Sequence, residues 1–263
     1  MKTPRKISAK LKLNVTLNHT KQDQVSIEFT NLIHASISRP LHFIERSLAV
    51  SSLISEHRVK LNAAKEYMSF FGYTQLVYNE QLMITLARMY DIKKRKYKTN
   101  CIEATLMFMQ ENIAELPPIK NREKTFRCML EHDFTQDEID GVKNLDDQAI
   151  TRLVMKHYSR WLKKDATLAQ ALKRLKNARN KQLAHSEDDT VLKFETPTFD
   201  DVKLLIHYAK NFFIVISMIY YDITMSLEGE YNGTKAAEAI KIPTSKVIND
   251  LLNLRESGKS KLL

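Results

Sequence analysis

Glycine and proline are scarce in this chain, with 5 and 6 of them among 263 residues. Such low usage argues against a β fold rich in tight turns. Cys101 and Cys128 are the only cysteines, which excludes a disulfide framework and a cysteine-rich zinc site and suits a reducing cytoplasm. The most apolar run, from Phe212 to Tyr221, is predicted to be too short to span a bilayer, and no apolar segment follows the basic N-terminus as in a secretory signal. We therefore expect a cytoplasmic protein that does not enter a membrane.

The charge balance is basic, because 41 Lys and Arg stand against 31 Asp and Glu, a formal net charge of +10. This excess favours an anionic partner such as RNA, although basic soluble proteins without a nucleic-acid role show it too. The histidines and cysteines lack the spacing of metal ligands, and there is no glycine-rich phosphate loop. We expect no metal and no cofactor.

Apolar residues recur at helical spacing along most of the chain, which predicts an all-α fold. We expect a multi-helix bundle with long helices and a short C-terminal helical tail. Residues 1–23 form a basic N-terminal arm, in which Lys10 to Leu17 alternates like a short strand; residues 24–228 form a helical domain, and residues 229–263 form the tail.

Capping residues and prolines set the expected helix boundaries. The predicted helices run from Val25 to Ile37, ending before Pro40; from Leu41 to Glu56; from Leu61 to Asp91; from an Asn100 cap to Ile113; from a Thr135 cap; from Asp146 to Leu162; from about Ala166 to about Ala184; from a Thr198 cap to Ile219; and, in the tail, over Lys235 to Lys241 and Ser245 to Leu254. Residues between Pro118 and Asp133 are expected to be irregular.

The helix predicted from Ala166 carries a cation on its apolar face. Leu168, Leu172 and Leu175 are spaced four and three apart, and Arg179 follows four residues later on the same face. Such a local contradiction is typical of functional sites, and a strained arginine there would raise the melting temperature when removed. If the helix continues, His185 lies about 9 Å further along the axis and roughly 120° round from Arg179.

Arg179, Asn180, four further residues and His185 together resemble the motif of the HEPN superfamily, in which Arg and His form a metal-independent RNase site. With helices before and after it, the motif is most similar to the HEPN branch of AbiU-type abortive-infection proteins. A weaker likeness, over Leu86 to Asp91, is to the end of the first long helix in that branch. The resemblance covers roughly Glu28 to Leu227 and implies a HEPN-like helical domain.

The resemblance implies roles for the motif residues. His185 is expected to act as general base, or as the acid for the leaving 5′ oxygen, because histidine titrates near neutral pH. Arg179 is expected to stabilise charge on the phosphoryl oxygens, and Asn180 to orient the phosphate or hold the helix end. HEPN families similar to this sequence are symmetric dimers with a composite active site, so we expect a homodimer.

Further residues are candidates for a wider RNA-binding surface or for support of the site. The basic candidates can equally be solvated surface; they are Lys173, Lys176 and Lys181 beside the motif and Lys93, Lys94, Arg95 and Lys96 in a predicted loop. Arg88 and Asp91 are expected to form an ion pair, either behind the site or simply on the surface. His157 shares an apolar stripe with Trp161 and is predicted to be a core residue.

Three functions remain open from the sequence. The first is an endoribonuclease that acts as a toxin or in anti-phage abortive infection, with an antitoxin or defence protein as partner. The second is a non-catalytic HEPN module that binds RNA or a protein. The third is a helical adaptor with a coincidental motif, in which Arg179 pairs with Glu187 or Asp188 and His185 complements a helix C-terminus.

Overall fold

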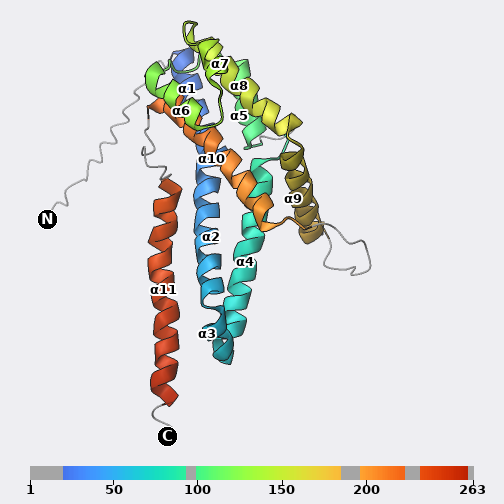
Figure 1. The fold of residues 1–263 in the computed structure, drawn as a ribbon, viewed down its shortest axis with the longest axis vertical. Helices are drawn as coiled ribbons and strands as arrows, with labels where there is room; N and C mark the ends of the chain where they lie inside the picture. The colour runs from blue at the N-terminus through green and yellow to red at the C-terminus, as the bar shows by residue number, and fades with distance from the viewer. Residues whose placement is uncertain (1–19, 93–98, 185–195, 223–231, 260–263) are drawn as a thin grey trace, which may run out of the picture.

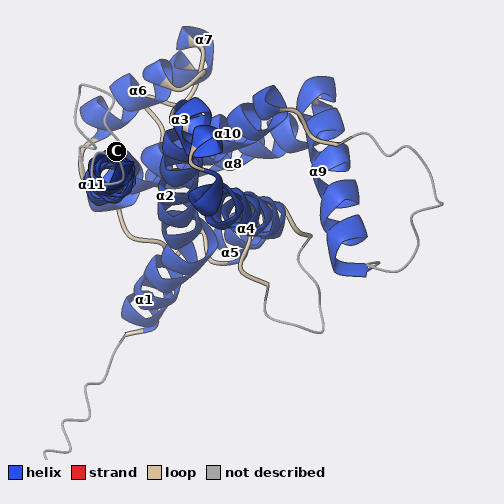
Figure 2. Cartoon of the chain, turned by 90° about the horizontal axis from the view of Figure 1, so that it is seen from below, coloured by secondary structure: helices blue, strands red, loops and turns tan. Residues whose placement is uncertain are grey.

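The structure is a computed structural model that describes residues 20–92, 99–184, 196–222 and 232–259. All regular elements in these ranges are helical, and no strand occurs within them (Figures 1 and 2). The predicted all-α bundle is confirmed. The strand expected over Lys10 to Leu17 lies outside the described residues.

The helices follow one another in a simple order. They are α1 (Lys21–Ile33), a π-helical turn η1 (His34–Ser38), α2 (Arg39–Glu56), α3 (Arg58–Ala63), α4 (Lys65–Met89), α5 (Ile102–Glu111), α6 (Arg122–Glu131), α7 (Gln136–Asp140), α8 (Asp147–Lys164), α9 (Ala166–Ala184), α10 (Phe199–Tyr221) and α11 (Asn232–Lys259).

Helix α10 is the central helix of the main hydrophobic core. Its capping box is complete, because Thr198 Oγ1 accepts the amide of Asp201 at 3.1 Å and the Asp201 carboxylate accepts the amide of Thr198 at 2.8 Å. Most side chains from Val202 to Tyr220 are buried, against neighbours that include α2, α6 and α9. The two hydrogen bonds between Thr198 and Asp201 confirm the predicted cap at Thr198.

Helix α10 also has the length and composition of a membrane span, with 23 residues and a mean hydropathy of 1.5 in its most apolar window. The apolar run is longer than the sequence prediction allowed, because Leu205 and Ile206 extend it before Phe212. However, 72% of that window is buried inside the described fold. A helix that is apolar on all sides and covered by other helices is typical of a protein core.

The first two helices form one continuous helical run, so the predicted end before Pro40 is wrong. A proline in a helix lacks an N–H group, and its ring clashes with the carbonyl four residues earlier. Here the amide of Arg39 donates to the carbonyl of His34, five residues back, and this wider π turn comes directly before Pro40. The π turn thus lets the helix pass the proline.

The motif helix matches its prediction, since α9 extends from Ala166 to Ala184. The Thr135 capping box is also confirmed. The predicted cap at Asn100 is wrong by one residue, because Cys101 occupies the N-cap position and its Sγ accepts the amide of Ala104 at 3.4 Å. The sequence prediction missed this cap because cysteine is an unusual capping residue.

Two helices differ more from the prediction. The long helix expected from Leu61 is divided at Ala64, which has φ −95° and ψ 73°. Helix α6 replaces the irregular segment expected after Pro118. Its N-cap is Asn121, whose side chain accepts the amide of Lys124 at 3.1 Å, so a good cap and a short buried face are enough for a helix in this charged stretch.

The C-terminal tail is helical, as predicted, but forms the single helix α11 instead of two short ones. It lies alongside α2, on the opposite side of the molecule from α9 (Figures 1 and 2). Pro243 lies inside α11 without ending it. A second hydrophobic cluster joins α11 to α2, α3 and α4; it is formed by Val50, Ile54, Leu61, Phe71 and Ile248.

Two neighbouring residues test the packing of α11. Ile248 is fully buried, whereas the side chain of Val247 is 53% exposed. Ile248→Ala should lower the free energy of unfolding by about 2–5 kcal/mol, because it leaves a cavity between α11 and α2. Val247→Ala is the control and should change it by less than about 0.5 kcal/mol. Urea denaturation monitored by circular dichroism measures both, and equal effects would contradict this packing.

Candidate functional site

Arg179 lies on the buried face of α9, as its spacing from the leucines predicts. Leu168 is 2% exposed and Leu175 is fully buried, and the Arg179 side chain one turn later is 19% exposed. Helix α9 packs against α4, α8 and α10. A guanidinium in this position needs partners to replace water.

The partner of Arg179 is Asp91, which follows the end of α4. Arg179 Nη1 donates to Asp91 Oδ1 at 2.7 Å, and the Asp91 side chain is 31% exposed. On the other side of the guanidinium, Nε and Nη2 donate to Asn180 Oδ1 at 3.4 and 3.3 Å. Asp91 and Asn180 therefore fix the plane of the guanidinium, which limits its rotation.

This pairing corrects one expectation from the sequence. Arg88 and Asp91 form no ion pair with each other in the described part of the chain, because Asp91 pairs with Arg179 and Arg88 is exposed. The helix turn at this point ends with the amide of Asp91 donating to the carbonyl of Arg88 at 3.2 Å. Asp91 supports the motif arginine directly, whereas no hydrogen bond or ion pair joins the Arg88 side chain to Arg179, Asn180 or Asp91.

Tyr90 anchors the residue that holds Arg179. Its hydroxyl donates to the carbonyl of Leu205, in the second turn of α10, and its side chain is 5% exposed. Burial, followed by the neighbouring Tyr208, raises the pKa of Tyr90 well above its ordinary value. The neutral phenol thus ties the end of α4 to α10 and so places Asp91.

A second arginine of α9 also has a carboxylate partner on another helix. Arg174 Nε donates to Asp201 Oδ2 at 2.7 Å, and Arg174 Nη2 donates to Oδ1 of the same carboxylate. Hydrogen bonds from Arg174, together with those from Thr198, lower the pKa of Asp201 to about 2 although burial opposes this. This bidentate pair joins α9 to the first turn of α10.

The structure brings only some of the predicted site residues together. Arg179, Asn180 and Asp91 form one cluster, and Lys176 lies beside it, whereas Lys173 is on an exposed face of α9. Several predicted residues lie outside the described residues, namely His185, Lys93, Lys94, Arg95 and Lys96, and the same is true of the side chain of Lys181. Glu187 and Asp188, the alternative partners for Arg179, also lie outside them.

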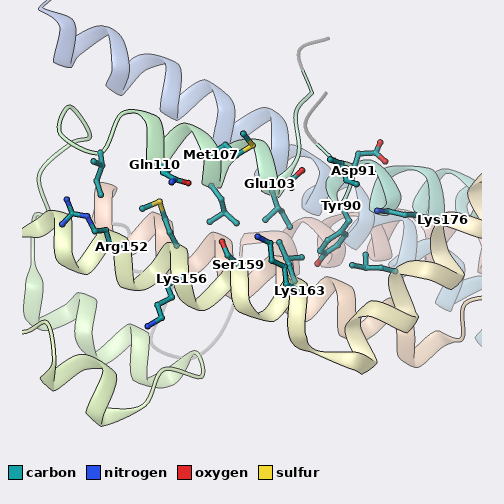
Figure 3. Close-up of a pocket in the computed structure, with 17 residues that line it drawn as sticks. Tyr90, Asp91, Glu103, Met107, Gln110, Arg152, Lys156, Ser159, Lys163 and Lys176 are labelled. Carbon is teal, nitrogen blue, oxygen red and sulfur yellow. The ribbon is translucent and has the colours of Figure 1, made fainter. Parts of the chain in front are cut away.

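A groove of about 700 Å³ adjoins the motif, between α5 and α8 (Figure 3). It ends at Tyr90 and Asp91, with Lys176 of α9 at the same end. Its apolar lining consists of Ile92, Ile102, Leu106, Met107, Ile113, Met155, Leu162 and Leu172. The sequence prediction did not find this groove, although α8 repeats cations at Arg152, Lys156 and Lys163 along one side.

His157 is a core residue, as predicted. It is 2% exposed, and its ring stacks on Phe134 with 3.8 Å between ring centroids. Neither ring nitrogen has a hydrogen-bond partner among the described residues. Burial lowers the pKa of His157, while Glu138, 3.9 Å away, raises it. The imidazole acts as an aromatic core side chain on α8.

The cysteines and carboxylates give no sign of a metal centre in the described ranges. Burial raises the pKa of the Cys101 thiol, and it raises that of Cys128 to about 12 with a smaller effect from Glu131. Both thiols are buried and free. In residues 20–92, 99–184, 196–222 and 232–259, no group of three or more His, Cys, Asp or Glu side chains could hold a metal ion.

Comparison with known proteins gives one match. The sequence model of the family described as AbiU2, a HEPN family, matches residues 27–228. The match begins within α1, extends beyond the end of α10 and contains Asp91, Arg179 and Asn180, while α11 lies beyond it. No curated protein and no solved structure matches the chain.

The contact between Arg179 and Asp91 can be tested by a double-mutant cycle. Each of Arg179→Ala and Asp91→Ala should lower the free energy of unfolding, and with it the melting temperature, because each leaves a half-buried charge without its partner. The two effects should be non-additive by about 0.5–3 kcal/mol, the range for residues in direct contact. This replaces the expectation of a strained arginine, since the guanidinium is paired. Additive effects in urea denaturation would contradict the contact.

Proposed function

We propose, from the premise that the chain belongs to the AbiU2 family of HEPN proteins, that it is a metal-independent endoribonuclease. In this proposal it acts in the cytoplasm. It serves either in abortive infection against phage or as a toxin that an antitoxin protein inhibits. The observation that supports the proposal most is the guanidinium of Arg179, which Asp91 and Asn180 hold in one orientation six residues before His185.

The proposed reaction uses the nucleophile that RNA carries. His185 takes the proton of a 2′-hydroxyl, the 2′ oxygen bonds to the adjacent phosphorus, and the bond from phosphorus to the 5′ oxygen breaks. A protonated acid supplies the proton that the leaving 5′ oxygen needs. Arg179 uses those N–H groups that do not face Asp91 or Asn180 to stabilise the charge on the phosphoryl oxygens. The products are a 2′,3′-cyclic phosphate and a 5′-hydroxyl.

A dimer is part of the same proposal. One histidine and one arginine provide too few groups for both the base and the acid of this reaction. A two-fold dimer would bring two pairs of Arg179 and His185 to one groove and so supply both. Arg179 lies five residues before the end of α9, and α9 is on the opposite side of the molecule from α11 (Figure 2).

A second candidate is a non-catalytic HEPN module that binds RNA or a protein. The ion pair itself favours it, because Asp91 gives Arg179 a structural reason to lie on the buried face of α9. In that case Arg179 holds α9 against the end of α4 and touches no substrate. The two candidates differ in whether the chain cleaves RNA.

The cleavage experiment separates them. The purified chain should cut RNA in excess chelator to give 2′,3′-cyclic phosphate ends, and 2′-deoxyribose at the scissile nucleotide should abolish the cut. His185→Ala should lower the rate by about 10²–10⁴ because the positioned base is lost. Arg179→Ala should have an effect of about 10²–10³ through lost charge stabilisation.

Two exposed residues outside the site are matched controls, His34 on η1 and Arg127 on α6. Changing either to alanine removes the same side-chain type and should leave the rate unchanged. Cleavage that requires added divalent metal, or wild-type rates for both His185→Ala and Arg179→Ala, would exclude this mechanism. RNA binding without any cleavage would favour the non-catalytic module.

The dimer can be tested in solution. Light scattering at the concentration of the cleavage assay should give twice the chain mass. If the two motifs complete one another, a mixture of Arg179→Ala and His185→Ala chains should recover activity that neither has alone, because a mixed dimer contains one intact arginine and one intact histidine. A monomer that cleaves at the full rate would contradict the composite site.

A further inference from the structure

The groove between α5 and α8 has cations that form no ion pair with any carboxylate in the described part of the chain. Lys163 of α8 and Lys176 of α9 point into it at the end near Asp91 (Figure 3), and neither forms an ion pair with any residue that the structure describes. In contrast, Arg174 and Arg179, on the same helix as Lys176, are both paired. The lysines therefore offer positive charge to a ligand and do not serve to join helices.

The remaining charges leave the groove positive. Arg152 lies at the far end and donates to the neutral Gln148. The groove has two carboxylates in its lining, Asp91 and Glu103, and Asp91 is neutralised by Arg179. Cations thus lie at both ends of a groove whose floor is apolar. This combination fits a ligand that has anionic groups along its length and apolar faces between them.

We infer that this groove binds a single-stranded segment of RNA; the inference rests on the proposed function and names the substrate class of that site. Unpaired bases have apolar faces that can reach Met107 and Leu162, while the phosphates lie at the lysines. A volume of about 700 Å³ is in the range of a small-ligand pocket, and a duplex keeps its bases stacked inside and cannot fill it.

The groove leads to the motif. Asp91 belongs to both, because it lines the groove and accepts a hydrogen bond from Arg179. Lys176 lies three residues before Arg179 on α9, roughly 4.5 Å along the helix axis. A strand that leaves the groove past Lys176 therefore passes beside the guanidinium of Arg179. The groove positions the strand, and Arg179 meets the phosphate that reacts.

The test uses the full chain and a short fluorescent single-stranded RNA with 2′-O-methyl groups, which cannot be cleaved by 2′-hydroxyl attack. The double variant Lys163→Glu/Lys176→Glu should weaken binding at least about tenfold and lower the salt dependence by roughly one to two counterions. Lys164→Glu/Lys120→Glu is the matched control: it makes the same charge change at two exposed lysines that do not line the groove, and should change affinity less than about twofold.

A second variant changes the floor without removing a cation. Met107 is 38% exposed on α5, so Met107→Glu should fold and should weaken the same RNA through charge repulsion in the groove. If the lysine double variant and Met107→Glu both bind like the wild type, the inference is wrong. Equal affinity for the annealed duplex would overturn the single-stranded class, and equally effective competition by polyglutamate would overturn RNA in favour of an acidic protein.

Cleavage of unmodified RNA by the same proteins separates the two proposals. If no RNA is cut but the lysine double variant loses binding, the nuclease proposal fails and the groove still binds RNA. If cleavage depends on Arg179 and His185 but the lysine double variant binds and cuts like the wild type, the groove inference alone fails. If both proposals are right, the lysine double variant should bind RNA weakly and cleave it slowly at low RNA concentration. Saturating RNA should then restore its cleavage rate.

Discussion

The ion pair between Arg174 and Asp201 fixes α9 against the start of α10. Asp201 is 5% exposed and receives hydrogen bonds from Arg174, while it also closes the capping box with Thr198. The carboxylate therefore stabilises the first turn of the central helix and orients the motif helix at once. Because removing one member of such a pair leaves an uncompensated charge, the position of α9 depends on it.

Arg179 repeats this arrangement five residues further along α9, with a partner on another element. Asp91 comes from the end of α4, which Tyr90 ties to α10 through the carbonyl of Leu205. The two arginines thus connect α9 to two different helices and hold it from both sides. The two arginine side chains are similarly buried, at 19% for Arg179 and 22% for Arg174, whereas Asp91 is more exposed than Asp201, at 31% against 6%. The carboxylate of the Arg179 pair is therefore the more accessible one, and it also lines the groove.

Local signals in the sequence predicted much of this fold correctly. The bounds of α9 follow from the leucine spacing, and the caps at Thr135 and Thr198 follow from side chains that bond only three residues away. The motif arginine was found because a cation on an apolar stripe is visible without a structure. Asp91 was named as a support for the site, but with Arg88 as its partner, because Arg179 is 88 residues away in the chain and only the packing of α4 on α9 brings the two together.

Features that depend on tertiary packing were missed for the same reason. Pro40 was expected to follow the end of a helix, but a π turn accommodates it, and the two short helices expected in the tail are one helix, α11, which packs along α2. The groove between α5 and α8 has lining residues from four parts of the chain, and none of these parts has a distinctive pattern alone. Net charge indicated an anionic partner. It could not distinguish the arginines of α9 that pair with carboxylates from the lysines that line the groove, because that difference depends on contacts between helices.

The two hydrophobic clusters differ in size and lie toward different ends of α2 and α4. Helices α2 and α4 each contribute to both clusters, with Ile44 and Leu86 in the main one and Ile54 and Phe71 in the smaller one with α11. Asp91 lies twenty residues beyond Phe71, roughly 30 Å along α4 if the helical rise continues. Proteins open locally in cooperative units, and a small cluster costs less free energy to open than a large one. The end with α11 can therefore open while the arginine pairs of α9 stay in place, so motion at one end of the molecule does not disturb the ion pairs at the other.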